Sequence, residues 1–438
     1  MENTISKARI YLTLFALGCA GGSIYIIPYI RSVFYDLQLQ VTGMTNTQSA
    51  FLMSVYAAFG MIIGVPVGMI VDRLNLKDGI RWALIGTTIV TIVYSFTYTS
   101  YVGSMLIWCA ICVFTSIYWP AFSKILSIVG QKTDKTGEGK SGLAFGIYYA
   151  FNGISAAVIN SISLWASTQF DNPYAAFRAP IFVAAAGTLI AAILVHFLMD
   201  DELVNLAEQA RAAEKNNAPK EKTKISLVEY VSILKIPMTW MMLIVCLVGY
   251  MLYSLQSYFT PYLTNVVGIS AAESGIFGII RTYVFLVLAM VGGFMADKVF
   301  KSPSKWMAVA FAIMAVVVAG IFIIPSGANP MLIGFYTLLP SAFVQMTYTI
   351  KYSTINETGI PAHLIGTTTS LASTIAGLVD LVLAPFIGWC LDTKGNAGYD
   401  ILFIILIISL LLGSVCAMAI VKSNKKRLAG QRVERSAS

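Results

Sequence analysis

Charged residues are scarce in this sequence. They make up 11% of its 438 residues, against roughly 25% in soluble domains. Hydrophobic residues make up 57%, and the mean hydropathy is +0.76. This balance excludes an ordinary soluble domain and indicates a membrane protein. The apolar runs also lack the strict alternation of a membrane β-barrel. Because lipid offers no partner to backbone polar groups, an all-α bundle is the remaining architecture.

Side chains for metal, redox or nucleotide chemistry are also few. The chain has two histidines and six cysteines, and no cluster of these with carboxylates has metal-ligand spacing. Cys109 and Cys112 form a Cys-x-x-Cys pair inside an apolar run, where packing is the expected role. The run from Gly139 to Ser141 matches only the end of a phosphate-binding loop. We therefore expect no metal, no cofactor, no ATP-driven step and no enzymatic activity.

About a dozen apolar runs are long enough to cross a bilayer, which takes about 20 residues. A stretch rich in Glu, Lys, Asn and Ala separates them into two sets. The predicted domains are an N-terminal six-helix bundle at 1–199, a cytoplasmic linker at 200–236, a C-terminal six-helix bundle at 237–424 and a cytoplasmic tail at 425–438. The linker is expected to be solvated and at most partly helical. A polar external loop is expected at 35–47, after a first span at 10–32.

The net charge is +8, but the basic residues are concentrated in particular loops, so the charge does not indicate a nucleic-acid partner. Lysines and arginines gather before the first span, after the second and fourth, in the central linker and in the tail, while the intervening loops hold few. This asymmetry follows the positive-inside rule and predicts that both termini are cytoplasmic. We expect a monomeric, multi-pass plasma membrane protein of a bacterial inner membrane, surrounded by the lipid bilayer.

A short charged motif follows the second span and returns in the second half. Its aspartates, Asp72 and Asp297, lie 297 − 72 = 225 residues apart, about half the chain. The residues of the motif are Gly68, Asp72, Arg73 and Arg81 in the first copy, and Gly293, Asp297 and Lys298 in the second. The pattern resembles the loop between helices 2 and 3 of the major facilitator superfamily of secondary transporters.

This resemblance implies twelve transmembrane helices in two pseudo-symmetric six-helix bundles, which transport by alternating access. It also implies that the motif is a cytoplasmic gate. Asp72 would face the start of helix 11 and Asp297 the start of helix 5, where the helix dipole favours a carboxylate. The alternative is an ordinary charged turn in which Gly68 and Gly293 ease close packing.

Two further matches indicate an internal duplication. The run Tyr25–Val33 aligns with Tyr258–Val266. Lys124, near the inner end of the fourth predicted span at 102–129, has a counterpart in Lys351 at the inner end of the tenth, at 330–351. Such parallel repeats place a substrate site between the halves, near the membrane midplane. Short runs such as Gly21–Tyr25 resemble those of poorly characterised bacterial carriers of organic anions and sulfonates.

Charges inside spans are functional candidates because each is costly in lipid. Arg281 lies about ten residues into the eighth predicted span, at 271–296, about 15 Å deep at 1.5 Å per residue, and its guanidinium keeps its proton. By resemblance to carriers of organic anions, it would hold the anionic group of the substrate; a structural ion pair is the alternative. Asp380, in the eleventh predicted span at 363–389, is the candidate for proton coupling. If it faces Arg281, protonation of Asp380 would free the arginine, but a permanent salt bridge between them is equally open.

Other cations and polar residues extend the candidate site. Arg31, at the outer end of helix 1, either snorkels to the interface or forms the outer lip of an anion site. For Lys124 and Lys351 snorkelling is favoured, and release of an anion is the other option. Tyrosines, amides and a tryptophan on the spans that line the cavity of this superfamily are further substrate-binding candidates, with packing as the alternative. These are Tyr25, Tyr29, Tyr56, Trp119, Tyr148, Tyr149, Asn152, Tyr253, Gln256, Gln345 and Tyr348.

The expected function is secondary active transport of a small organic anion, a carboxylate or sulfonate, by a proton-linked symporter or antiporter. One alternative is a carrier of a neutral sugar or a lipophilic drug, although Gly146–Asn160 in helix 5 lacks the proline of the common drug-exporter signature. A second alternative is a transporter-like protein that senses a ligand.

Overall fold

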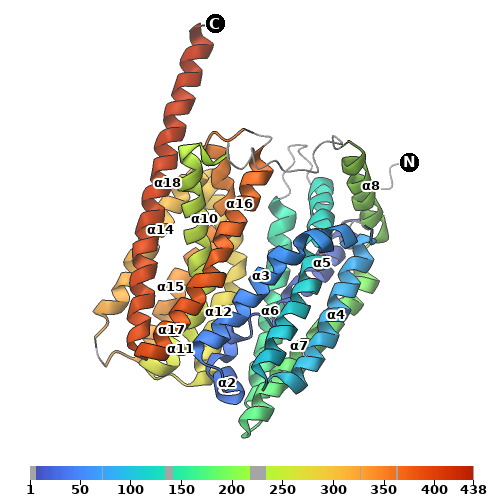
Figure 1. Ribbon diagram of the computed structural model, residues 1–438. Coiled ribbons are helices and arrows are strands. Elements are labelled where there is room, and N and C mark those ends of the chain that lie inside the picture. The colour runs from blue at the N-terminus through green and yellow to red at the C-terminus, as the bar shows by residue number, and fades with distance from the viewer. Residues whose placement is uncertain are drawn as a thin grey trace. The chain divides into compact units, whose positions relative to one another are not determined.

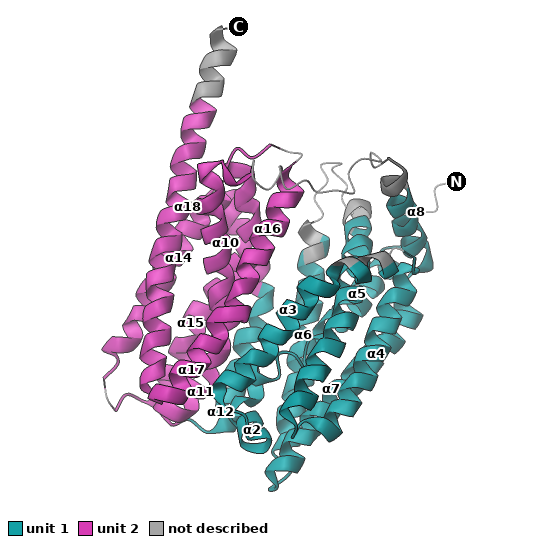
Figure 2. Cartoon of the chain, viewed as in Figure 1, with its two compact units in different colours: residues 1–219, 269–287 teal, residues 220–268, 288–438 magenta. Residues whose placement is uncertain are grey.

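The computed structural model describes residues 6–71, 73–133, 142–217, 233–325, 327–361 and 364–437. Within these ranges the chain is helical, with turns and short connections and no strand, which confirms the all-α prediction (Figure 1). The chain divides into two compact units. Unit 1 comprises residues 1–219 and 269–287, and unit 2 comprises residues 220–268 and 288–438 (Figure 2).

Unit 1 contains the first half of the chain and a short piece of the second. Its helices are α1 (Lys7–Ile24), α2 (Arg31–Thr42), α3 (Asn46–Val71), α4 (Leu76–Thr97), α5 (Tyr101–Thr133), α6 (Gly142–Ser167), α7 (Pro173–Leu198), α8 (Asp201–Asn217), α12 (Ala271–Thr282) and η3 (Val284–Val287). Their ends follow ordinary capping rules. The side chain of Asn75 accepts from the backbone N–H groups of Lys77 and Asp78, and Asn172 caps α7 just before Pro173.

Unit 2 contains the remaining helices. They are α10 (Pro237–Leu255), η1 (Gln256–Tyr258), α11 (Phe259–Tyr262), η2 (Leu263–Val267), α13 (Leu288–Phe294), η4 (Met295–Val299), α14 (Pro303–Gly320), η5 (Ile321–Ile323), α15 (Pro330–Tyr348), η6 (Lys351–Glu357), α16 (Ile365–Leu378), η8 (Val379–Leu383), α17 (Ala384–Lys394) and α18 (Ala397–Ala437). The last helix, α18, packs along α14 and α10. The predicted tail at 425–438 therefore continues the last span as a helix to Ala437.

Ten helices among the described residues are long and apolar enough to cross a membrane. These segments are Asn46–Gly64, Leu76–Thr97, Tyr101–Val129, Gly146–Ser167, Pro173–Leu198, Pro237–Val267, Ala271–Val299, Pro303–Ile323, Ile365–Lys394 and Ala397–Ala429. The first and tenth predicted spans are occupied by α1 and α15. Each of the twelve predicted spans therefore lies mainly within helical segments, although the first is interrupted at residues 25–30.

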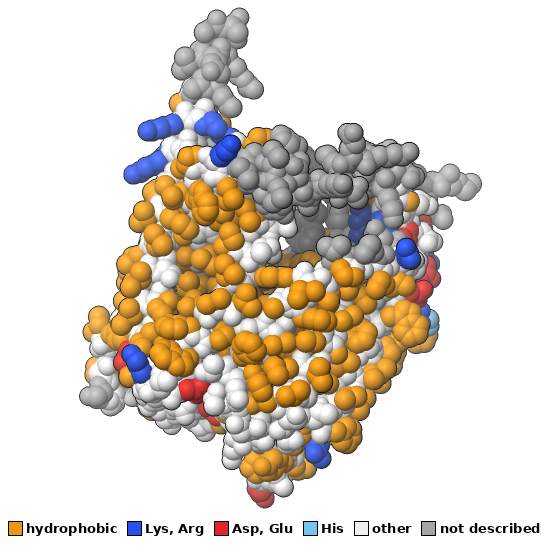
Figure 3. Space-filling model, in the orientation of Figure 1, with side chains coloured by type: hydrophobic (Ala, Val, Ile, Leu, Met, Phe, Trp, Pro, Cys, Tyr) orange, Lys and Arg blue, Asp and Glu red, His pale blue; other side chains and the backbone are white. Residues whose placement is uncertain are grey.

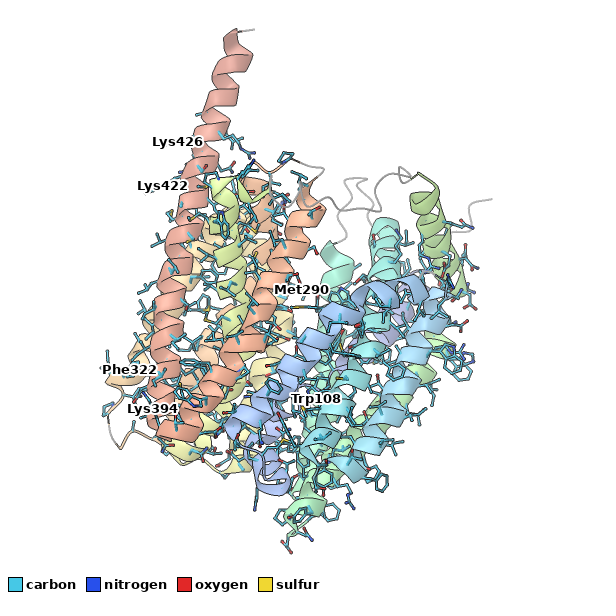
Figure 4. All side chains as sticks on the ribbon, viewed as in Figure 1. Trp108, Met290, Phe322, Lys394, Lys422 and Lys426 are labelled. Atoms are coloured by element: carbon cyan, nitrogen blue, oxygen red, sulfur yellow. The ribbon has the colours of Figure 1, made fainter. Side chains whose placement is uncertain are left out.

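Apolar side chains cover the outward flank of α18, the helix that leads to the C-terminus in Figure 1. Ile408, Leu412 and Val415 are each more than half exposed along its length, and the corresponding surface is hydrophobic in Figure 3. Lys422 and Lys426 lie near one end of unit 2, and Lys394 lies at the other end (Figure 4). This sequence of lysine, apolar flank and lysine is the pattern of a membrane-spanning surface.

The first span differs from its predicted form. The helix is interrupted at residues 25–30, a stretch that contains Pro28, and then resumes as α2 (Arg31–Thr42). Proline lacks an N–H group and clashes with the preceding turn, so it interrupts a helix. The predicted external loop at 35–47 is wrong for most of its length, because α2 continues to Thr42 and buries Tyr35 and Gln38.

The start of the predicted linker is also structured. Helix α8 packs on α5 and α4, and Leu203, Val204 and Ala207 on one of its faces are almost completely buried. A solvated linker was the wrong expectation for residues 201–217, because apolar residues at helical spacing form a buried stripe among the charges. The charged run beyond Asn217 lies largely outside the described residues.

Candidate functional site

Asp380 lies in unit 2, in the π-helical turn η8 between α16 and α17. Tyr250 and Ser254 are four residues apart on α10 and share a helix face. Their hydroxyls donate to the Oδ2 and Oδ1 atoms of Asp380, respectively. Asp380 is only 5% exposed, and π-helical turns recur at functional sites. The two hydroxyls therefore provide a donor to each oxygen of a carboxylate that is buried inside unit 2.

Lys351 begins η6, which is separated from α15 by two residues, and it is 2% exposed. Its ammonium lies 3.5 Å from the ring centroid of Tyr348, 4.8 Å from that of Tyr352 and 5.6 Å from that of Tyr250. It also donates to the backbone carbonyl of Tyr348 at 3.1 Å. The snorkelling prediction is wrong for Lys351, because aromatic faces take the place of water around its charge. Lys124, its predicted counterpart, is half-buried in unit 1.

The substrate-binding candidates of unit 2 are partly gathered on α10 and α15. The rings of Tyr253 and Tyr348 stack with their centroids 4.1 Å apart, and both lie near the ring of Tyr250. Gln345 is completely buried on α15, and Gln256 is 3% exposed just after α10. The structure thus brings two of the predicted tyrosines into one aromatic group beside Asp380 and Lys351.

Two arginines are buried in unit 1. Arg31 begins α2 and is 5% exposed, with its guanidinium 5.0 Å from the ring centroid of Tyr35. Arg281 lies near the end of α12 and is 1% exposed. Helices α2 and α12 pack against each other. Val33, two residues after Arg31, and Ile279, two residues before Arg281, belong to the same apolar cluster. Burial excludes the snorkelling alternative for Arg31. The predicted contact of Arg281 with Asp380 joins the two units and stays a prediction.

A second polar group of unit 1 surrounds Gly21 of α1. The Tyr118 hydroxyl shares a hydrogen bond of 3.2 Å with the Tyr148 hydroxyl, and the Asn152 amide donates to Tyr148 at 3.2 Å. A Cβ atom on Gly21 would collide with the Tyr148 hydroxyl and the Asn152 amide, so the glycine allows these groups to reach α1. Tyr25 adds an edge-on ring contact with Tyr118.

Tyr118 is a member of this group that the sequence analysis missed. It is fully buried, whereas its neighbour Trp119, the predicted candidate, is 51% exposed and packs its ring on Phe122. Hydropathy gives no sign of the polar contacts of Tyr118. Because Tyr118 and Trp119 are adjacent in sequence, the two differ only in the face of α5 on which they lie. Tyr29 lies in the interruption between α1 and α2 and is half-buried.

The first copy of the charged motif is anchored by helix α8. Arg211 donates to the backbone carbonyls of Val71 at 3.1 Å and Leu74 at 3.0 Å. Glu208 accepts from the backbone N–H of Leu76 at 2.7 Å and forms an ion pair with Arg211 at 2.9 Å. These two side chains therefore satisfy the end of α3 and the start of α4, where helices leave backbone groups without helical partners.

Further ion pairs flank this loop. Lys77 contacts Asp201 at 2.6 Å, and Arg81 contacts Asp78 at 2.7 Å. Arg73 is exposed. Asp72 lies outside the described residues, and Gly68 lies in α3 at a position whose surroundings are not described. The predicted contact of Asp72 with the start of helix 11 stays a prediction.

The second copy of the motif, in unit 2, has a different local structure. Asp297 and Lys298 are exposed in the π-helical turn η4. Gly293 has open space around the position of a Cβ, whereas a Cβ on Gly292 would collide with the backbone carbonyl of Met346 on α15. The glycine that permits close packing is therefore Gly292, which the motif did not single out. The gating contact predicted for Asp297 stays a prediction.

Several curated proteins are similar to this chain. It is 26% identical over 416 residues to the inner membrane protein YihN of Escherichia coli (strain K12), covering 94% of this chain and 95% of that protein. It is 23% identical over 391 residues to the inner membrane protein YqcE of the same organism, covering 88% of each. Both similarities extend over nearly the whole length, which agrees with a membrane location.

Solved structures share the fold. A bacterial homolog of the human lysosomal transporter Spinster, in an inward-facing and unoccupied conformation, has a TM-score of 0.65 at 17% identity and covers 97% of this chain and 99% of its own. The peptide transporter POT in complex with sulfate has a TM-score of 0.63 at 14% identity, over 95% and 94%. These likenesses confirm the predicted fold. The sequence model of the Major Facilitator Superfamily matches residues 11–384. The chain therefore belongs to the Major Facilitator Superfamily, and it is a secondary transporter and not an enzyme.

Proposed function

We propose that this transporter carries a small organic anion, a carboxylate or a sulfonate, by alternating access, and that its transport is coupled to protons or proceeds by exchange. The observation that carries the proposal is the pair of buried arginines, Arg31 and Arg281, on two packed helices of unit 1. The moving parts in this proposal are the two six-helix halves at 1–199 and 237–424, in a monomer with both termini in the cytoplasm.

The two arginines favour an anionic substrate for an energetic reason. A guanidinium in an apolar environment is costly, and it does not relieve that cost by losing its proton. Its planar donors match carboxylate-like oxygens in pairs. A neutral sugar would require hydrogen bonds but no buried cation. Two such cations on packed helices therefore support an anion site better than a sugar or drug site.

Polar groups of each unit would orient the rest of the substrate. In unit 1 these are Tyr25, Tyr148 and Asn152, close to Gly21, and in unit 2 the stacked rings of Tyr253 and Tyr348. Aromatic walls with a few placed hydrogen-bonding groups are typical of small-molecule sites.

Asp380 is the proton carrier in this proposal. Two hydroxyl donors favour its charged form, and the apolar surroundings favour its neutral form, so a modest change in its neighbours moves it between the two. The support is its burial in η8 and its contacts with Tyr250 and Ser254. The gating role of Asp72 and Asp297 also belongs to the proposal, by analogy with the superfamily loop.

Uptake by purified protein in proteoliposomes tests the proposal. The panel comprises radiolabelled carboxylates, sulfonates, phosphates, neutral sugars and a lipophilic cation, each with and without an inward proton gradient. We expect uptake of carboxylates or sulfonates, and we expect Arg281→Ala to reduce it at least tenfold. Arg178→Ala is the matched control, because Arg178 is an exposed arginine of the same unit.

Three outcomes would count against the proposal. Uptake of neutral sugars alone, unchanged in Arg281→Ala, would replace an anion carrier with a sugar carrier. Uptake of lipophilic cations would indicate a drug carrier. Binding of a panel compound without any uptake or exchange would indicate a ligand sensor.

A further inference from the structure

Lys351 has surroundings that a lysine at the end of a membrane helix does not need. Such a lysine normally extends its ammonium to the headgroups. Here the residue is 2% exposed, and the rings of Tyr348, Tyr352 and Tyr250 lie within 5.6 Å of its ammonium. The ammonium also donates to the Tyr348 carbonyl. The chain thus buries an amino group inside unit 2, where the field of its charged form is weakly screened.

Tyr250 connects this cation to Asp380. Its ring is one of the three around the Lys351 ammonium, and its hydroxyl donates to the Asp380 carboxylate. Among the described residues of unit 2, the three tyrosines and Cys246 are titratable groups in contact with Lys351, and the Cys246 thiol donates to the Lys351 backbone carbonyl. On α10, Tyr250 and Ser254 each donate a hydroxyl to Asp380, and of these two only Tyr250 is titratable.

We propose that Lys351 is a positioning residue that sets the charge of Asp380 through Tyr250. The inference rests on the proposed function, in which Asp380 carries the proton. Lys351 itself contacts neither substrate nor proton. It holds the ring of Tyr250 by a cation–π interaction and thereby directs the Tyr250 hydroxyl to the carboxylate.

Two physical effects act in the same direction. A cation near the face of a phenol withdraws electron density from the ring, which makes the hydroxyl a stronger hydrogen-bond donor to a carboxylate. The positive field of the ammonium also stabilises the charged form of Asp380 directly. Both effects vanish when the side chain at 351 is neutral, so Asp380 then binds a proton more readily.

The geometry also explains how the hydrogen bond between Tyr250 and Asp380 is weakened and formed again. When Asp380 gains a proton, Tyr250 faces a neutral group and its hydrogen bond weakens, because charge-assisted hydrogen bonds are roughly twice as strong as neutral ones. The aromatic group around Lys351, including the stacked Tyr348 and Tyr253, remains to guide Tyr250 back.

The test uses the purified full-length protein and needs no substrate. Dicyclohexylcarbodiimide reacts with protonated carboxyl groups in apolar surroundings, and the labelled Asp380 peptide is quantified by mass spectrometry as a function of pH. The readout is the pH of half-maximal labelling, which reports the protonation of Asp380 and not the access of the reagent. Lys351→Met removes the charge at similar length, and Lys351→Arg keeps it.

We expect Lys351→Met to move the midpoint upward by about one pH unit or more, which is about a tenfold change in the ratio of neutral to charged Asp380. Lys351→Arg should stay close to the wild type. Lys124→Met, at the equivalent position of unit 1, should leave the midpoint unchanged. In a Tyr250→Phe background the effect of Lys351→Met should shrink by at least half, because the connecting hydroxyl is absent.

Equal midpoints for the wild type and Lys351→Met would overturn the inference, as would an equal displacement by Lys124→Met. If Lys351→Met does not fold, as judged by gel filtration, Lys351→Gln provides the neutral variant. The outcome is separable from the proposed function. If Lys351→Met displaces the midpoint but uptake does not depend on the proton gradient, the link between Lys351 and Asp380 is upheld and proton coupling is rejected. If the midpoint is unchanged but uptake depends on Asp380 and on the proton gradient, the link is rejected and proton coupling is upheld.

Discussion

The same helix–helix interface occurs once in each unit, with different chemistry. In unit 1, α1 packs on α6, and Gly21 admits the Tyr148 hydroxyl and the Asn152 amide. In unit 2, α10 packs on α16 and η8, and Ser254 donates to Asp380. Gly21 and Ser254 are equivalent positions, because 254 − 21 = 233 is also the offset between Tyr25 and Tyr258.

The polar partners on the other helix differ between the units. In unit 1 the amide of Asn152 lies against Gly21, and in unit 2 the carboxylate of Asp380 accepts a hydrogen bond from Ser254. A neutral amide therefore faces one of the two equivalent positions, and a carboxylate faces the other. The comparison teaches that the two interfaces differ in charge. The interface of unit 2 contains a buried carboxylate, whereas that of unit 1 contains tyrosines and an amide, and the buried arginines of unit 1 lie on α2 and α12.

The largest expected effect comes from making unit 2 resemble unit 1. Asp380→Asn puts an amide in the position of the carboxylate, so the interface keeps a hydrogen-bonding group but loses its titratable one. Accumulation driven by a proton gradient should fall roughly 100-fold, within the range for loss of a positioned proton-transfer group, while exchange of unlabelled for labelled substrate persists. Undiminished gradient-driven uptake in Asp380→Asn would remove the proton role.

The next effect tests the packing of unit 1. Gly21→Val places a branched side chain where a single Cβ already collides with Tyr148 and Asn152. We expect a loss of about 1–3 kcal/mol in stability, the range for overpacking, measured as a lower Tm of the purified protein. Gly64→Val is the matched control, since a Cβ at Gly64 has open space. Equal loss in both variants would mean that the polar group does not depend on the glycine.

A smaller effect concerns the two copies of the charged motif. The loop of unit 1 is tied to α8 by Arg211, whereas Asp297 and Lys298 of unit 2 are exposed. Arg211→Ala leaves two backbone carbonyls without their donor, at a cost of about 1 kcal/mol for partly exposed groups. Hydrogen exchange should accelerate about fivefold at Leu74 to Leu76 and not at the second copy. Equal acceleration at both copies would indicate general destabilisation.

The smallest effect separates the two donors of Asp380. Ser254→Ala removes one hydroxyl from the carboxylate but leaves Tyr250 in place. The ratio of neutral to charged Asp380 should rise about threefold, less than in Tyr250→Phe, since Tyr250 also carries the influence of Lys351. The carbodiimide midpoints of the two variants measure this difference, and a larger displacement in Ser254→Ala would contradict the assigned roles.

Much of the fold could be predicted from hydropathy and repetition. Spans are long and apolar, so their number and order are encoded locally, and the duplicated aspartates identified the superfamily. The break after Ile24 was harder to predict, because Pro28 and its neighbours have the hydropathy of a span. Helix α8 was missed because its three buried residues lie among charges that dominate the composition.

The candidate site was less accessible to sequence reasoning. Arg281 and Asp380 stood out because isolated charges are conspicuous in apolar helices. Their partners did not. Ser254 is a neutral residue with no hydropathic signal, and a lysine such as Lys351 at a helix end fits either a snorkelling or a buried position. The spacing of Tyr250 and Ser254 on one face of α10 was the available clue, but its meaning depends on which helix lies opposite.

The central claim of the proposal is that the buried arginines of unit 1 bind the anion and that Asp380 of unit 2 carries the proton. The most direct measurement compares counterflow exchange of the transported anion, at equal pH on both sides, in Arg281→Ala and Asp380→Asn proteoliposomes. The account predicts that exchange falls at least tenfold in Arg281→Ala and stays within threefold of the wild type in Asp380→Asn. Equal loss of exchange in the two variants, or loss in Asp380→Asn alone, would contradict it.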